Sequence, residues 1–177
     1  MKIVAVVGPS GVGKSSLIER LVAELKKRSR SVAVIKHCSQ GFSLDYPGKD
    51  SWRFREAGAD GVALVSPRET AVLQWSSAGA EDVRLASSFF GPMDFVIVEG
   101  RRPAPRIPKL ELLRKGVAER VSTPLAELAA VVADFDVVVS RPLFHFRQVK
   151  EIVDFLELGA RPRRPACRVR SRKKKES

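Results

Sequence analysis

Residues 3–18 of this chain read IVAVVGPSGVGKSSLI, and this stretch decides the fold. Its first part, Ile3 to Val7, is a continuous apolar run rich in β-branched residues, as expected for a strand buried on both faces of a parallel sheet. The helix that follows is amphipathic, and its apolar face holds Leu17, Ile18, Leu21, Val22 and Leu25. A buried strand, a glycine-rich turn and an amphipathic helix in this order indicate an α/β fold.

The turn between them is Gly8-Pro9-Ser10-Gly11-Val12-Gly13-Lys14-Ser15, a full match to the P-loop pattern G-x-x-x-x-G-K-[ST]. Backbone N–H groups curled into a nest can surround a triphosphate, and the three glycines permit the left-handed backbone that the nest needs. The helix adds its unpaired N–H groups and the positive end of its dipole. We therefore expect a nucleoside triphosphate here, with Lys14 reaching the β- and γ-phosphates and the Ser15 hydroxyl ligating Mg²⁺.

Two carboxylates bracket a further buried run, Phe95 to Val98, and either is a candidate for the second group at the metal. Asp94 precedes the run and Glu99 follows it. Ligands of a parallel sheet lie beyond the carboxyl ends of the strands, beside the P-loop. This geometry favours Glu99, and the alternative is that Glu99 is an ordinary loop carboxylate.

The rest of the chain alternates apolar runs with amphipathic stretches. This alternation predicts a P-loop NTPase-type α/β three-layer sandwich with a mostly parallel sheet, in one domain of residues 1–160. Further strands are expected at Ser31–Lys36, Gly61–Val65, Thr70–Trp75, Lys109–Leu113, Leu128–Val132 and Val137–Val139. Further helices are expected at Asp50–Ala57, Glu81–Phe90 and Val149–Leu158.

Composition narrows the class of protein. The net charge is +12, but residues 161–177 hold nine Lys or Arg and one Glu, so this segment accounts for +8. Its prolines and dense like charge favour a disordered tail, and without aromatic residues for base stacking we do not expect nucleic acid as a partner. No run of about 20 apolar residues predicts a membrane span. Two cysteines exclude a disulfide framework, and we expect a cytoplasmic protein.

Several segments together resemble one family. The P-loop is followed in order by Ile35-Lys36-His37, the stretch Asp45-Tyr46-Pro47-Gly48-Lys49-Asp50-Ser51, the helix end Arg55-Glu56-Ala57-Gly58-Ala59, and Val98-Glu99-Gly100. This set resembles the MobB family of molybdopterin-guanine dinucleotide biosynthesis adapter proteins over about residues 1–115. Because P-loops are shared by many families, the stretch from Asp45 to Ala59 carries the distinction, with Lys36-His37 in support.

The resemblance implies a GTP-binding homodimer with weak intrinsic hydrolysis. Such a protein assists the guanylyltransferase that joins a GMP unit to molybdopterin in molybdenum cofactor biosynthesis. On this sequence it implies that Gly11 to Ser16 hold phosphate and that Ser15 and Glu99 serve Mg²⁺. It also places Asp45 in a mobile loop near the γ-phosphate, which makes Asp45 a candidate catalytic residue beside Lys14. From the residues alone, the alternative for Asp45 to Ser51 is a plain turn and helix cap.

Guanine selection by a carboxylate needs hydrogen bonds from the ring N1–H and the exocyclic amine. The usual N-K-x-D motif is excluded because the chain contains no asparagine. Asp134, at the end of the run Leu128 to Ala133, is the candidate substitute, and Asp136 is the next. Either aspartate is also explained as a strand terminator.

Two departures from the family pattern leave alternatives open. Cys38 follows His37 where a second histidine is frequent in the family, and Arg101-Arg102 replace an aromatic residue and a lysine after Gly100. The two arginines are readable as anion contacts or as a solvated turn. A small-molecule kinase, with an arginine-bearing lid at residues 101–106, and a metallochaperone NTPase, with His37 and Cys38 at a metal, are the competing functions. The adapter is expected to be at most a slow GTPase, because no arginine finger or activating glutamine is found.

Overall fold

The structure is a computed structural model, and it describes residues 1–38, 41–75, 82–100 and 107–159. Its strands are β1 (Lys2–Val7), β2 (Val32–Lys36), β3 (Gly61–Val65), β4 (Thr70–Gln74), β5 (Phe95–Glu99), β6 (Lys109–Leu113), β7 (Leu128–Ala133) and β8 (Leu143–His145). Its helices are α1 (Lys14–Lys27), α2 (Asp50–Glu56), α3 (Asp82–Phe89) and α4 (Val149–Glu157). Among the described residues, no helix is long and apolar enough to cross a membrane.

Six strands form the main sheet in the order β2-β5-β1-β6-β7-β8, and every neighbouring pair in it is parallel. All carboxyl ends of these strands therefore meet at one edge, which we call the carboxyl edge, and all amino ends meet at the opposite, amino edge. The strand β1 lies in the interior, between β5 and β6. The P-loop that follows β1 is thus placed near the middle of the carboxyl edge.

The side chains of β1 point alternately into the two hydrophobic cores that lie on opposite faces of this sheet. Val4 and Val6 join a core that includes α1 and α4, whereas Ala5 and Val7 join a second core on the opposite face, which includes Ala86 of α3. Successive strand residues point to opposite faces, so a strand buried on both faces must be apolar at every position. The predicted three-layer α/β sandwich is confirmed.

The prediction of a strand at Val137–Val139 is wrong. Residues 137–139 are irregular, and the edge strand after β7 is β8, which pairs with β7 in parallel. A parallel neighbour must start at the same edge as β7, so the chain first has to return to the amino edge. Residues 134–142 make that return. Val138 is fully exposed within them, while Val137 and Val139 pack against the sheet.

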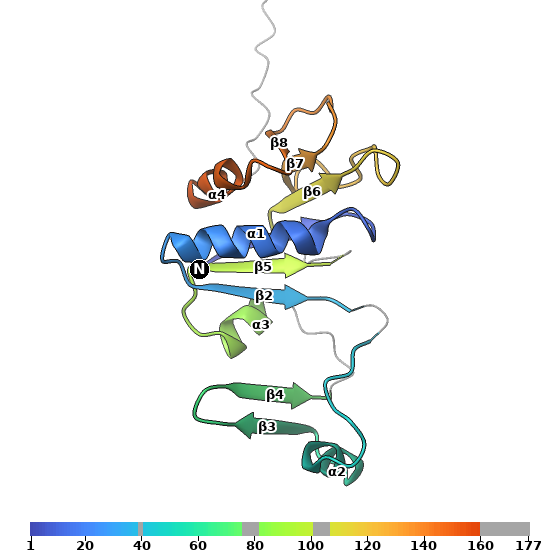
Figure 1. The fold of residues 1–177 in the computed structure, drawn as a ribbon, viewed down its shortest axis with the longest axis vertical. Coiled ribbons are helices and arrows are strands. Elements are labelled where there is room, and N and C mark those ends of the chain that lie inside the picture. The colour runs from blue at the N-terminus through green and yellow to red at the C-terminus, as the bar shows by residue number, and fades with distance from the viewer. Residues whose placement is uncertain (39–40, 76–81, 101–106, 160–177) are drawn as a thin grey trace, which may run out of the picture.

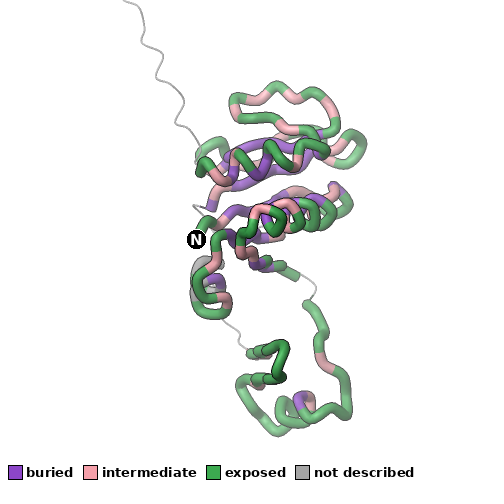
Figure 2. Tube along the Cα trace, turned by 60° about the vertical axis from the view of Figure 1, so that its left-hand side comes forward, coloured by how far each residue is buried: buried purple, intermediate pink, exposed green. Residues whose placement is uncertain are grey.

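A second, smaller region lies apart from the main sheet. We call residues 41–75 the arm; it contains α2 and the antiparallel pair β3–β4. Figure 1 shows α2 and this hairpin at the opposite end of the molecule from α4. Figure 2 shows that nearly all of the arm is exposed, in contrast to the strands of the main sheet.

Candidate functional site

The P-loop takes the nest conformation that the sequence predicts. Gly8, Gly11 and Gly13 all have positive φ, at 141°, 79° and 102°. A Cβ on Gly8 would lie 3.0 Å from Val12 Cγ1 and 3.1 Å from the Leu112 carbonyl oxygen, so glycine is required there by space as well as by conformation. Gly13 is the N-cap of α1, which aims the helix N-terminus into the loop.

Lys14, the first residue of α1, points back over the loop. Its Nζ donates to the carbonyl oxygens of Gly8 at 3.0 Å and Pro9 at 2.7 Å. The ammonium is thus held at the mouth of the nest, where a phosphate oxygen would offer a stronger, charged acceptor.

Ser15 and Glu99 are brought together by the fold, although 84 positions separate them in the chain. The Ser15 hydroxyl donates to Glu99 Oε1 at 2.9 Å. Glu99 ends β5, the neighbour of β1, so the pairing of these two strands sets the distance. A hydroxyl and a carboxylate side by side at a phosphate nest are the oxygen ligands that Mg²⁺ uses together with phosphate groups. The residues therefore fit a magnesium–triphosphate complex.

The two sequence motifs at residues 35–37 and 98–100 lie side by side. The His37 N–H donates to the Glu99 carbonyl oxygen at 2.9 Å, and Lys36 Nζ lies 3.8 Å from Glu99 Oε2. A Cβ on Gly100 would lie only 3.0 Å from the Cβ of His37. The segments 35–37 and 98–100 thus form one side of the site, with glycine at position 100 permitting their close approach.

Asp94 occupies the opposite edge of the sheet. Its Oδ2 accepts hydrogen bonds from the Ser31 N–H at 2.8 Å and the Ser31 hydroxyl at 3.0 Å. These hydrogen bonds to the charged form hold the pKa of the Asp94 carboxyl below its usual value. Asp94 therefore fixes the start of β5 to the start of β2, away from the P-loop.

Asp134 follows β7 at the carboxyl edge, as expected. Its Oδ1 accepts a hydrogen bond from the Lys115 N–H at 3.0 Å, and its Oδ2 lies 3.7 Å from Arg114 Nε. A carboxylate has about four acceptor positions, so these contacts leave acceptor capacity for a base. Asp136 is exposed.

Two residues beside the P-loop were not predicted from the sequence. Arg114 follows β6 and Phe146 follows β8. A Cβ on Gly13 would lie 3.1 Å from Arg114 Nη2 and 3.6 Å from Phe146 Cε1. The rule that selected Glu99, a charged residue directly after a buried strand, would have found Arg114 had it been applied to cations.

Asp45 lies in the arm and makes local contacts. Its Oδ1 accepts hydrogen bonds from the Tyr46 N–H at 3.0 Å and the Ser51 hydroxyl at 2.9 Å, so the carboxylate shapes the segment that leads into α2. A role for Asp45 near the γ-phosphate stays a prediction. Arg101, Arg102 and the tail 161–177 lie outside the described residues.

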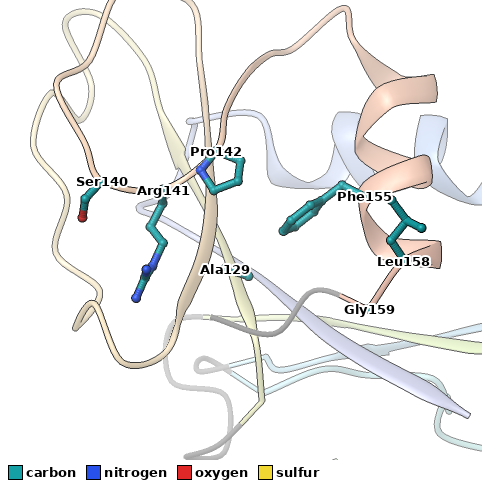
Figure 3. Close-up of a pocket in the computed structure, with 7 residues that line it drawn as sticks. All are labelled: Ala129, Ser140, Arg141, Pro142, Phe155, Leu158 and Gly159. Atoms are coloured by element: carbon teal, nitrogen blue, oxygen red, sulfur yellow. The ribbon is translucent and has the colours of Figure 1, made fainter. Parts of the chain in front are cut away.

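A separate hollow of about 830 Å³ lies towards the amino edge. Figure 3 shows Phe155 of α4 pointing into it towards Ala129 and Pro142. Arg141 also lines it, but this guanidinium donates to the carbonyl oxygens of Leu128 at 2.9 Å and Leu125 at 2.6 Å. The hollow is therefore not part of the phosphate site.

Comparisons with known proteins identify a family and relatives of this chain. The family described as molybdopterin guanine dinucleotide synthesis protein B, MobB, matches residues 3–134. A molybdopterin-guanine dinucleotide biosynthesis adapter protein of Haemophilus influenzae is 34% identical over 160 residues, covering 88% of this chain and 87% of that protein. The adapter protein of Escherichia coli is 28% identical over 152 residues, covering 83% of this chain and 86% of that one.

Among solved structures, Bacillus subtilis MobB is similar with a TM-score of 0.70 and 26% identity, covering 93% of this chain and all of that one. A MobB homologue from Bacillus stearothermophilus has a TM-score of 0.63 at 22% identity, over 90% of this chain and 98% of that one, and shows the shared fold. The family match spans the P-loop, Glu99 and Asp134. This chain therefore belongs to the MobB family.

Proposed function

We propose that this chain is a GTP-binding adapter in molybdopterin guanine dinucleotide biosynthesis, with weak Mg²⁺-dependent GTPase activity. The observation that carries the proposal is the 2.9 Å contact between Ser15 and Glu99 at a complete P-loop, in a chain of the MobB family. The contact supports the proposal because it brings together two oxygen groups of the kind that Mg²⁺ binds beside phosphate.

The proposal assigns each residue a task in binding. The backbone of residues 8–16 surrounds the phosphates, and Lys14 exchanges its hydrogen bonds to Gly8 and Pro9 for phosphate oxygens. Ser15 and Glu99 hold the metal, which neutralises phosphate charge when bound. Asp134 reads the guanine, and Asp45 acts near the γ-phosphate when the arm is suitably placed. Hydrolysis is slow because Gly100 follows Glu99 where a glutamine could position water.

An adapter needs a partner, and the relatives are named as adapter proteins of molybdopterin-guanine dinucleotide biosynthesis. We propose that the partner is the guanylyltransferase that attaches GMP to molybdopterin. In this proposal the bound nucleotide sets the state in which the adapter meets that guanylyltransferase, in the cytoplasm. The kinase and metallochaperone alternatives receive no support from the contacts of the described residues, and the segment 101–106 that a kinase lid would use lies outside them.

We also propose that the arm forms the interface of a homodimer. Phe54 of α2 and Val65 of β3 are 55% and 77% exposed, and Phe42, Leu44 and Tyr46 before α2 are exposed as well. A two-stranded hairpin is at best marginally stable alone in water, and contiguous exposed apolar surface marks an interface. A second copy of the chain would cover both hairpins at once.

The nucleotide proposal is tested by titrating the protein with GTP and ATP, with and without Mg²⁺, beside the Lys14→Ala variant. We expect GTP to bind at least about tenfold more tightly than ATP, a gap of about 1.4 kcal/mol, with slow turnover. Lys14→Ala should lose most of the affinity. A preference for ATP, fast hydrolysis, or unchanged binding by the variant would refute the proposal.

The dimer is tested by the molar mass in solution of the wild type and of Val65→Asp. We expect a dimer and a monomer, respectively, because a charge at the centre of an apolar interface is costly. Val138→Asp is the matched control, since Val138 is fully exposed and lies outside the arm. A monomeric wild type, or a dimeric Val65→Asp variant, would contradict the assignment of the arm.

A further inference from the structure

A cluster of Arg114, Asp134 and Phe146 lies beside the P-loop, on the side away from Glu99. The order of the sheet fixes this arrangement. Glu99 ends β5 on one side of β1, whereas the three cluster residues follow β6, β7 and β8 on the other side. The approach of Arg114 Nη2 and the Phe146 ring to Gly13 shows that the cluster touches the loop itself.

Arg114 is held in place by both its backbone and its side chain. Its N–H and carbonyl pair with those of Ala118 at 2.9 Å each, which closes a turn directly after β6. The guanidinium carbon lies 5.0 Å from the centroid of the Phe146 ring, a cation–π contact. Phe146 is buried, and its carbonyl accepts a hydrogen bond from Arg20 of α1 at 2.9 Å.

Part of the Arg114 side chain remains exposed to solvent. Nε is buried, lies 3.7 Å from Asp134 Oδ2 and makes no hydrogen bond within the described residues. Yet 41% of the Arg114 side chain is exposed beside the P-loop. A fixed, planar cation that remains open to solvent at a phosphate site is suited to bind a ligand.

The position of the metal ligands determines which part of a nucleotide would reach Arg114. If Ser15 and Glu99 hold the metal of a magnesium–triphosphate complex, the γ-phosphate end would lie on the β5 side of the loop. The nucleoside must then leave the loop on the β6–β7 side. We infer that Arg114 is a nucleotide-binding residue that faces the nucleoside, and that it orients Asp134 for the base; the inference rests on the proposed GTP site.

The test compares ligands with and without a nucleoside. GTP and GDP affinities are measured by calorimetry, and inorganic tripolyphosphate is measured by displacement of a fluorescent GTP analogue. Arg114→Met should weaken GTP and GDP binding by the same factor, about tenfold or more, and leave tripolyphosphate binding within about twofold of the wild type. Arg114→Lys should restore little of the affinity for GTP and GDP, because lysine keeps the positive charge but lacks the planar guanidinium group. Arg120→Met, an exposed arginine in the same connection, is the matched control.

The outcomes separate this inference from the proposed function. If Arg114→Met still binds tripolyphosphate, its P-loop is intact. Weaker binding of GTP and GDP together with unchanged binding of tripolyphosphate therefore supports the inference. Unchanged GTP binding, or an equal loss of tripolyphosphate, overturns it while the GTP site stands. If the wild type binds no better than Lys14→Ala, the proposed function fails and the inference fails with it.

Discussion

Asp94 and Glu99 bracket the same buried run of β5, yet the protein uses them in opposite ways. Asp94, at the amino end of β5, accepts two hydrogen bonds from Ser31 and connects two strands. Glu99, at the carboxyl end, accepts a hydrogen bond from the Ser15 hydroxyl, a group that a metal ion can share. Chemically similar carboxylates thus lie in different surroundings according to the end of the strand they occupy: Asp94 connects two strands, whereas Glu99 lies beside the P-loop.

The contrast extends along the two edges of the sheet. At the amino edge, charges pair with one another: Arg28 lies 3.1 Å from Glu24, 2.5 Å from Asp154 and 2.9 Å from Glu157. Hydrogen bonds from Arg30 and Arg28 lower the pKa of Glu157. At the carboxyl edge, Lys14, Glu99 and Arg114 surround the P-loop. Charge therefore stabilises the fold at one edge and is available for a ligand at the other.

Glu99→Gln should give the largest effect that separates the two edges. Removing the negative charge while keeping a hydrogen-bond acceptor for Ser15 should weaken Mg²⁺-dependent nucleotide binding by roughly 10–100-fold. Binding without Mg²⁺ and the Tm should stay at wild-type values, since the ion pair of Glu99 with exposed Lys36 is long and weak. Calorimetry with and without Mg²⁺ checks this. Equal losses in both conditions would show that Glu99 does not act through a metal.

Arg28→Met should show the reverse behaviour, with a smaller effect. The substitution leaves Asp154 and Glu157 close together without their shared cation, so the Tm should fall by a few degrees. Nucleotide affinity should not change, because Arg28 lies at the far end of α1 from the P-loop. Lys26→Met, an exposed neighbour with the same change of charge, is the control. A loss of nucleotide affinity would contradict the separation of the edges.

The local sequence pattern predicted the conformation of the P-loop and the carboxylate that lies beside it. The strand, the P-loop and α1 are adjacent in the chain, and the rule on carboxyl ends is enough to choose Glu99 over Asp94. What the sequence could not provide is which strands become neighbours. The contact of Arg114 with Gly13 depends on β6 pairing with β1, across about a hundred residues. The same reason explains the misplaced strand at 137–139, where a strand-like pattern lies on the return path to β8.

The arm shows a second limit of local pattern. The sequence predicts its two strands, at Gly61–Val65 and Thr70–Trp75, and they form where expected. Nothing in that pattern indicates that the hairpin stays apart from the main sheet, because an exposed apolar strand and a buried one have the same sequence signature. Only the three-dimensional arrangement shows that this region needs another surface to cover it.

Asp94→Asn should give the smallest effect and the one with the clearest dependence on pH. The folded pKa of Asp94 is lower than its unfolded value, so the carboxylate stabilises the fold at pH values above about 4, the usual pKa of aspartate. This contribution is lost as the pH falls through the folded pKa. The amide that replaces the carboxylate still accepts one hydrogen bond, so the variant's Tm should be only slightly lower at neutral pH.

The measurement is the difference in Tm between wild type and Asp94→Asn from about pH 7 to about pH 3. The difference in Tm should be constant near neutral pH and should shrink below about pH 4. Protonation of Asp94 in the wild type then removes the same stabilising negative charge that the substitution removes in the variant. Asp60→Asn, an exposed aspartate of the arm, should show no such trend. A difference that grows on acidification would mean that Asp94 is stabilised in its protonated form, and the structural role assigned to the amino edge would fall.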